Sequence, residues 1–201
     1  MGRVRESSPL EDVVVARSSQ RRIDANRSLP ESLLRTAMSA ALRGIALTHY
    51  VVVHHVEGLA PGLYHWPDLD APARAGAMRD EVYRVCAEQG LARDAAFVVI
   101  GATYVRTLDD REYREAQLAA GLVEGRVHLL AYALGASASG MTFVDSEVPA
   151  LLGEPLDALL FTCVGVPEYK AAHGGPPGAP TAIRMVKPRV SSATMTKPRE
   201  G

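Results

Sequence analysis

The longest regular pattern in the chain is Asp110–Leu134, DREYREAQLAAGLVEGRVHLLAYAL. Apolar and small residues return in it at intervals of three and four, which is the spacing of one face of an α-helix. They are Ala116, Ala119, Ala120, Val123, Val127, Leu130 and Leu134. We expect a helix of this length to be central to the domain, with its small residues allowing close packing.

Shorter apolar segments lie on both sides of this helix. Strands are expected at Thr48–Val56, Leu63–Trp66, Ala95–Val105 and Ala158–Val166. Further helices are expected at about 28–44, 78–89 and 147–152. This alternation of helices and apolar strands predicts an α+β domain.

The composition divides the chain into three parts. Residues 1–12 are polar and mixed, which is typical of a flexible leader, and residues 13–167 carry the regular patterns. Residues 168–201 are rich in Gly, Pro and Lys/Arg, as expected of a C-terminal arm or tail.

The bulk properties exclude several classes of function. The 201 residues are 47% hydrophobic with a net charge of −1, so no basic face for nucleic acid is expected. No apolar run is long enough to span a bilayer and the N-terminus lacks the core of a secretory signal, which predicts a cytoplasmic protein without a membrane partner. Cys86 and Cys163 are expected to be buried thiols.

A metal site is not expected. His54 and His55 are adjacent in a predicted strand, so their side chains point to opposite faces and cannot share one ion. We expect one of the two in the core and the other outside it. A Ser-His-Asp order, a Walker loop and the GxGxxG pattern are also missing from the sequence, which disfavours hydrolases and common nucleotide folds.

Several segments, in order, resemble the flavin-dependent nitroreductase-like superfamily, and most closely its SagB/ThcOx-type dehydrogenases. RSSQR at 17–21 resembles the Arg-Ser-x-x-Arg flavin motif, and VEGLAPGLY at 56–64 resembles a hairpin of that branch. YREAQLAAG at 113–121 is similar to its central helix, GMTFVDSEV at 140–148 to its G-L-T-F-x-D-D-E-V segment, and VGVP at 164–167 to its closing strand.

The resemblance implies a nitroreductase-like sandwich with a central, mostly antiparallel sheet flanked by helices and one long central helix. It also implies a homodimer that binds FMN between its subunits and transfers hydride through the flavin N5. NAD(P)H is the donor that the resemblance suggests, and a small or peptide-derived molecule is the expected substrate.

The resemblance assigns the N-terminal motif to the flavin phosphate. Arg17, Ser18, Ser19 and Arg21 carry guanidinium and hydroxyl donors suited to that group. Taken alone, the stretch is more typical of a solvated basic loop. The matches downstream favour phosphate binding for Arg17 and Arg21. Arg184 stands where the family often returns a basic residue to the phosphate, although a basic tail explains it at least as well.

The segment Gly135–Gly140 is expected to be a small-residue loop after the long helix. Small residues let the backbone approach a flat ring, so the resemblance assigns Ser137, Ser139, Gly140 and Met141 to the flavin. An ordinary loop that ends a helix with Gly explains the same composition equally well.

Three departures from the family pattern bear on activity. The Lys-Tyr pair of azoline-oxidising members is replaced by about Thr107-Leu108, and the flavin-facing loop after Arg43 is shortened. Few aromatic residues are available to stack on a substrate; the candidates are Tyr64, Trp66, Tyr104 and Phe143. Two hypotheses stay open, an FMN oxidoreductase or a degenerate homologue that stores flavin or supports an active paralogue.

Overall fold

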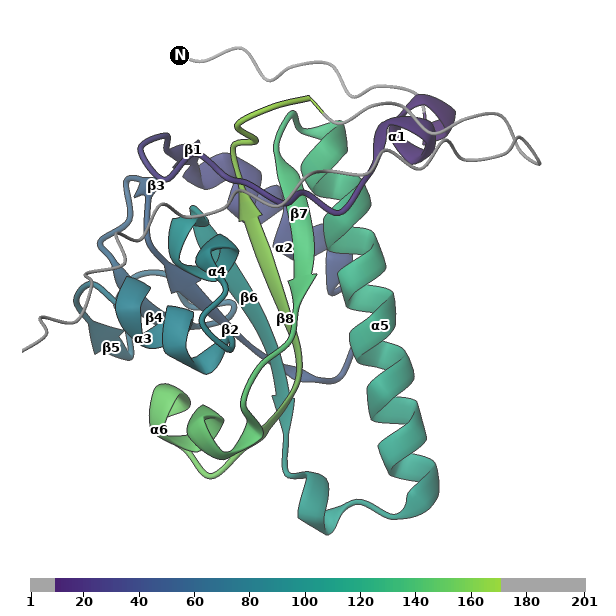
Figure 1. The fold of residues 1–201 in the computed structure, drawn as a ribbon. Helices are drawn as coiled ribbons and strands as arrows, with labels where there is room; N and C mark the ends of the chain where they lie inside the picture. Colours follow the sequence, from purple (N-terminus) through teal and green to yellow (C-terminus); the bar gives the residue numbers. More distant parts are fainter. Residues whose placement is uncertain (1–9, 171–201) are drawn as a thin grey trace, which may run out of the picture.

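The computed structural model describes residues 10–170 and places a six-stranded sheet between layers of helices (Figure 1). All pairings in this sheet are antiparallel, in the order β5-β4-β2-β6-β8-β7. The strands are β2 (Thr48–Val53), β4 (Gly62–His65), β5 (Arg74–Ala75), β6 (Phe97–Thr103), β7 (Ser137–Met141) and β8 (Asp157–Gly165). The short strands β1 (Leu29–Pro30) and β3 (Val56–Glu57) pair in parallel outside it.

Helices α2 (Glu31–Ala41) and α5 (Asp110–Ala133) cover one face of the sheet, and α1 (Leu10–Ala16) packs on α5. The other face carries α3 (Arg79–Val85), α4 (Gly90–Asp94) and α6 (Val148–Leu152). Alternate residues of β2 serve the two faces: Val51 and Val53 pack toward α2 and α5, and Tyr50 and Val52 toward the other layer. The expected α+β sandwich is confirmed.

The long helix forms as predicted and starts at a capping box. The Asp109 side chain accepts hydrogen bonds from the N–H groups of Arg111 and Glu112, and the Glu112 side chain accepts one from the N–H of Asp109. Burial begins only at Ala120, so the first half of α5 extends past the sheet (Figure 1). Two short 3₁₀ segments, η1 (Val105–Thr107) and η2 (Asp145–Glu147), complete the described elements.

The loop expected at Gly135–Gly140 is instead mostly a strand, so that expectation was wrong. Gly135 has a φ of +83° and follows the end of α5, as expected from the alternative interpretation in which a glycine ends the helix. The chain then enters β7, which pairs with β8 from Ser137 opposite Gly165 to Met141 opposite Phe161. Small residues have weak strand preference, and it is the free edge of β8 that makes this segment extended.

The two ends of the chain are described only in part. Helix α1 begins at Leu10, inside the stretch expected to be a leader, and the last described residue is Lys170. Arg184 lies outside the described residues. Among the helices of residues 10–170, none is both long enough and apolar enough to cross a membrane.

Candidate functional site

The segment that follows α1 runs along the start of the edge strand β7. The N–H of Gln20 donates to the carbonyl of Ala138 (3.2 Å), and the N–H of Asp24 donates to the carbonyl of Val166 (2.9 Å). Two stretches assigned to the flavin on sequence, 17–21 and 137–141, are therefore neighbours in space.

Contacts with the end of α5 hold this segment in place. The hydroxyl groups of Ser18 and Tyr132 lie 3.0 Å apart, and the Tyr132 hydroxyl donates to the Ser18 carbonyl (3.0 Å). Arg17, Ser19 and Arg21 are exposed. Their side chains are thus accessible, whereas the hydroxyl of Ser18 is engaged by the helix.

The four predicted residues of β7 differ in what they offer a ligand. Ser137 is fully buried and its hydroxyl donates to the Gly165 carbonyl (3.1 Å), and Met141 packs into the core on the α3 side. Ser139 is buried as well. Because the Ala138 carbonyl faces Gln20, strand alternation directs the N–H and C=O of Gly140 to the same outer edge. Gly140 is therefore the most accessible of the four to a ligand.

Two polar residues of α5 lie against this edge and were missed by the sequence analysis. A Cβ built on Gly140 would collide with the Glu124 carboxyl group, so only glycine allows this approach. His128 lies one helical turn further on, with its Nε2 3.8 Å from Glu124 Oε1. Glu124, His128 and Tyr132 form a polar row at four-residue spacing beside the apolar stripe of α5. This spacing is the sequence pattern from which the row could have been predicted.

Burial controls the charge of both side chains. Burial, and secondarily the charge of Arg17, lowers the pKa of His128 to about 4. Burial raises the pKa of Glu124. The same desolvation therefore favours the uncharged form of each group, and Arg17 must lie near His128 to act on it.

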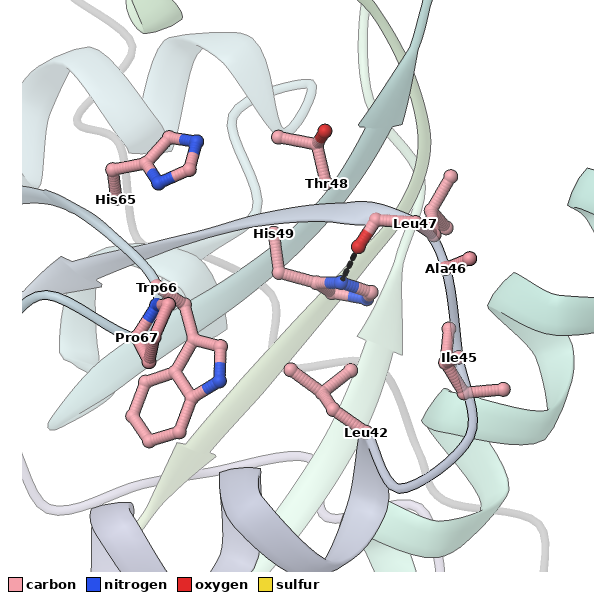
Figure 2. A pocket seen from close by; sticks show the side chains of 9 residues that line it. All are labelled: Leu42, Ile45, Ala46, Leu47, Thr48, His49, His65, Trp66 and Pro67. Atoms are coloured by element: carbon pink, nitrogen blue, oxygen red, sulfur yellow. Dashed lines mark hydrogen bonds between the residues drawn. The ribbon is translucent and has the colours of Figure 1, made fainter.

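A separate pocket of about 420 Å³ lies where the chain passes from α2 to β2 (Figure 2). The connection expected to be shortened, residues 42–47, forms part of its wall, and the Arg126 side chain donates to the carbonyls of Ala41 and Arg43 (2.9 Å each). His49 Nδ1 lies 2.7 Å from the Leu47 carbonyl. The pocket is lined by Leu42, Ile45, Ala46, Leu47, Thr48, His49, His65, Trp66 and Pro67.

The aromatic candidates are separated by the fold. Trp66 lines the pocket just described, and Tyr104 is exposed. Tyr64 is 2% exposed and its hydroxyl donates to the Ala60 carbonyl (2.7 Å), so it belongs to the core. Phe143 stacks on Phe161 with ring centroids 4.7 Å apart.

The histidine pair and the cysteines lie as expected. His54 is buried and His55 exposed, and Cys86 and Cys163 are both buried and free. Burial raises the pKa of Cys86 to about 12. Within residues 10–170, no three His, Cys, Asp or Glu side chains are grouped so that they could hold a metal ion.

No protein-family model matches the sequence, and no curated protein matches it. Solved structures do match the fold. A provisionally classed nitroreductase from Anabaena variabilis has a TM-score of 0.72 and 25% identity, covering 79% of this chain; the chain spans only 38% of that protein's length.

Two further structures match over nearly their whole length. A provisionally classed NAD(P)H:FMN oxidoreductase from Staphylococcus epidermidis has a TM-score of 0.66 and 11% identity, covering 88% of this chain and 95% of that one. A provisionally classed nitroreductase from Desulfovibrio desulfuricans, solved in complex with FMN, has a TM-score of 0.61 and 15% identity, covering 90% and 99%. The predicted nitroreductase-like fold is confirmed.

Proposed function

From this nitroreductase-like fold, we propose that the chain is an FMN-dependent oxidoreductase whose flavin lies between the 17–21 segment, α5 and β7. The hydrogen bond from Gln20 to Ala138 carries the proposal, because it joins the two stretches that the sequence assigned to the flavin. The FMN complex of the Desulfovibrio protein supports the same cofactor. When bound, FMN supplies hydride transfer, and the protein supplies binding and orientation.

The residues of this region fit such a ligand. Arg17 and Arg21 offer exposed guanidinium groups for the phosphate, and Ser19 an exposed hydroxyl. Gly140 offers its backbone N–H at the outer edge of β7, while its face toward α5 is covered by the Glu124 carboxyl. Arg184 stays a prediction as a further phosphate contact.

The finer assignments are part of the same proposal. We assign the chain to the SagB/ThcOx-type branch, with NAD(P)H as the donor and a small or peptide-derived substrate. A second copy of the chain is proposed to complete the site.

The alternative is a degenerate homologue without turnover, which stores flavin or supports an active paralogue. It is favoured by the absence of the Lys-Tyr pair near Thr107, where Asp109 is instead the N-cap of α5. Arg126 also donates to the carbonyls of Ala41 and Arg43 and so holds the short connection after α2 against α5. Only the first hypothesis requires hydride transfer.

Flavin titration tests the proposal. We expect purified protein to be yellow, and the Arg17→Ala/Arg21→Ala double variant to bind FMN at least about a hundred-fold more weakly, since each charged contact contributes about 1.5–3 kcal/mol. Arg22→Ala is the matched control, because Arg22 pairs loosely with Glu168 at 4.0 Å. A colourless protein that takes up no FMN would refute the oxidoreductase and the flavin-storing homologue, and would leave only a supporting role beside an active paralogue.

Anaerobic reduction separates the two hypotheses. Bleaching of the bound flavin by NADH or NADPH is expected for the oxidoreductase. A flavin that binds and stays yellow with either donor would favour the non-catalytic alternative.

A further inference from the structure

The face of α5 that lies against β7 carries an acid that no feature of the flavin assignment uses. We propose that Glu124 is the acid–base residue of this site, donating the proton that a substrate takes up together with hydride, and that His128 positions it. This inference rests on the proposed oxidoreductase function.

The Glu124 carboxyl packs against the backbone of Gly140 in β7. Its Cδ lies 3.0 Å from the position that a Cβ on Gly140 would occupy, so the carboxyl packs directly on the bare backbone. The Glu124 side chain remains 32% exposed, which leaves it a path to solvent protons. It therefore borders both the strand edge assigned to the flavin ring and the surrounding water.

His128 is the partner that the fold provides for this carboxyl. It is 6% exposed, and its Nε2 has no hydrogen-bond partner among residues 10–170 although Glu124 Oε1 is 3.8 Å away. A small rotation of Glu124 would bring a carboxylic O–H within hydrogen-bond distance of this nitrogen. The fold therefore places an unpartnered ring nitrogen of His128 beside the carboxyl group of Glu124.

Burial favours the protonated form of this acid. Burial raises the pKa of Glu124, and burial with the charge of Arg17 keeps His128 neutral by lowering its pKa to about 4. From β7 the nearest group is the backbone of Gly140, which carries no charge. A neutral carboxylic acid can donate a proton, and it does not repel the added charge of a reduced flavin.

Asp109, an acid near the expected position, is already engaged. Azoline-oxidising members of the SagB/ThcOx-type branch carry their Lys-Tyr pair before the central helix, and here Asp109, beside the matching stretch, accepts two backbone hydrogen bonds at 2.8 Å. Its carboxylate stabilises the start of α5. Glu124, about four turns further along the same helix, lies against β7 instead.

The electron-poor atom of an unsaturated substrate would accept the hydride, hence two electrons, that FMN would supply when bound and reduced. The carboxylic O–H bond of Glu124 breaks, and its proton forms the new bond at the neighbouring heteroatom of the substrate. Water then returns a proton to the carboxylate.

Three proteins test the inference: the wild type, Glu124→Gln and Glu115→Gln. Glu115 lies on the exposed side of α5 and pairs with Arg111 at 2.8 Å, so it is the matched control. FMN titration comes first. If none of the three binds FMN, the proposed function itself fails; if all three bind with similar affinity, the acid–base role can be measured separately.

The first measurement is a carboxyl NMR titration of protein labelled at glutamate side chains, without flavin. The signal that Glu124→Gln removes is expected to titrate above the ordinary range of glutamate. The second is the anaerobic oxidation of reduced flavin by a quinone across a pH series. In the wild type and in Glu115→Gln, the rate should fall as the pH rises through the measured pKa of Glu124.

In Glu124→Gln the same rate should be about 10²–10⁴-fold lower and lose that pH dependence. Glu124→Asp, which keeps an acid on a shorter stem, should recover part of the rate and of the pH profile. An ordinary or low pKa for Glu124, or a Gln variant that binds FMN and keeps the wild-type rate and profile, would overturn the inference.

Discussion

Single residues of this protein show how strongly burial can change protonation. His54 is 6% exposed, with its Nε2 3.2 Å from the Ala92 carbonyl. Burial, and then the charge of Arg79, lowers the pKa of His54 to about 4. The folded state therefore holds His54 neutral over a pH range in which the unfolded chain binds a proton.

This difference predicts a loss of stability in acid. The free energy of unfolding is unaffected by His54 above the unfolded pKa of about 6.5. It falls as the pH drops toward the folded pKa, and the loss amounts to about 2 kcal/mol at about pH 5. Urea unfolding at about pH 7.5 and about pH 5 should show a smaller acid effect for His54→Gln than for the wild type. His128 contributes equally to both proteins, and the exposed His55→Gln is the control; an unchanged acid effect in His54→Gln would contradict the prediction.

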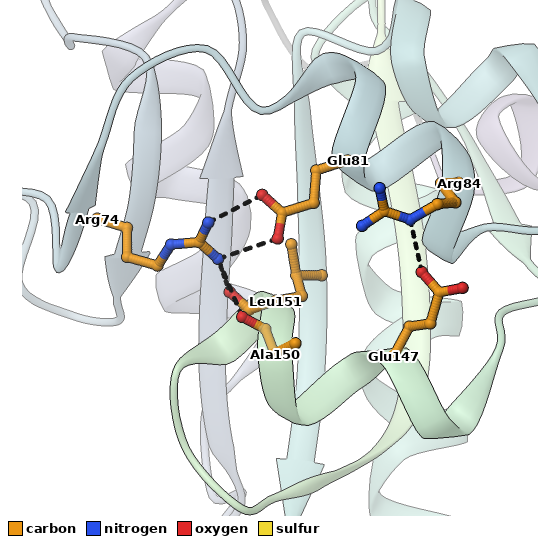
Figure 3. A network of polar contacts seen from close by, with 6 residues as sticks. All are labelled: Arg74, Glu81, Arg84, Glu147, Ala150 and Leu151. Carbon is orange, nitrogen blue, oxygen red and sulfur yellow. Dashed lines mark hydrogen bonds and ion pairs between the residues drawn. The ribbon is translucent and has the colours of Figure 1, made fainter.

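At the scale of elements, one arginine joins three parts of the sheet's α3 side (Figure 3). Arg74, in β5, makes a bidentate pair with Glu81 of α3 (2.9 and 3.1 Å) and donates to the carbonyls of Ala150 and Leu151 in α6. Arg84 makes a single, more exposed contact with Glu147 (2.8 Å). The first network satisfies carbonyls at a helix end, and the second is a surface ion pair.

Replacing the two arginines should therefore change the stability of the protein by different amounts. Arg74→Ala is expected to lower the free energy of unfolding by about 1–2 kcal/mol, because carbonyls of α6 lose their donors and Glu81 its partner. Arg84→Ala is expected to leave stability nearly unchanged, since exposed pairs contribute little. Denaturant titration of both variants checks this, and equal losses would show that Arg74 is no more than a surface charge.

At the scale of the whole molecule, large apolar side chains remain exposed where α5 extends past the sheet. Tyr113, Leu118 and Leu122 are 42%, 74% and 48% exposed. Exposed apolar surface of this kind is typical of a site of association. It agrees with the proposal that a second copy closes the flavin site.

A dimer of this kind predicts a measurable mass. Light scattering should give twice 21.5 kDa for the wild type, and Leu118→Glu/Leu122→Glu should give the monomer mass and bind FMN more weakly. Val144→Glu, at the exposed apolar residue just before η2, is the control. A wild-type monomer that binds FMN fully would remove the second copy from the site.

The fold was predictable where apolar residues repeat at regular spacing over a long segment, or where they form a continuous run. The α5 helix and the central strands β2 and β6 follow from local pattern, because burying an apolar face has only a few local solutions. Strand β7 was missed, since the small residues of Ser137–Met141 carry no period and become extended only by pairing with β8. The row Glu124–His128–Tyr132 was missed because the apolar stripe next to it dominated the pattern.

Sequence alone determined the layered α+β architecture, the extent of the long helix and the two stretches that carry flavin-like motifs. Only the tertiary structure decided that these stretches meet, through contacts such as Ser18 with Tyr132, 114 positions apart. It also decided that Glu124 and His128 are desolvated together. The physical reason is that local periodicity depends on neighbours in the chain, whereas burial and proton affinity depend on which distant segments pack around a side chain.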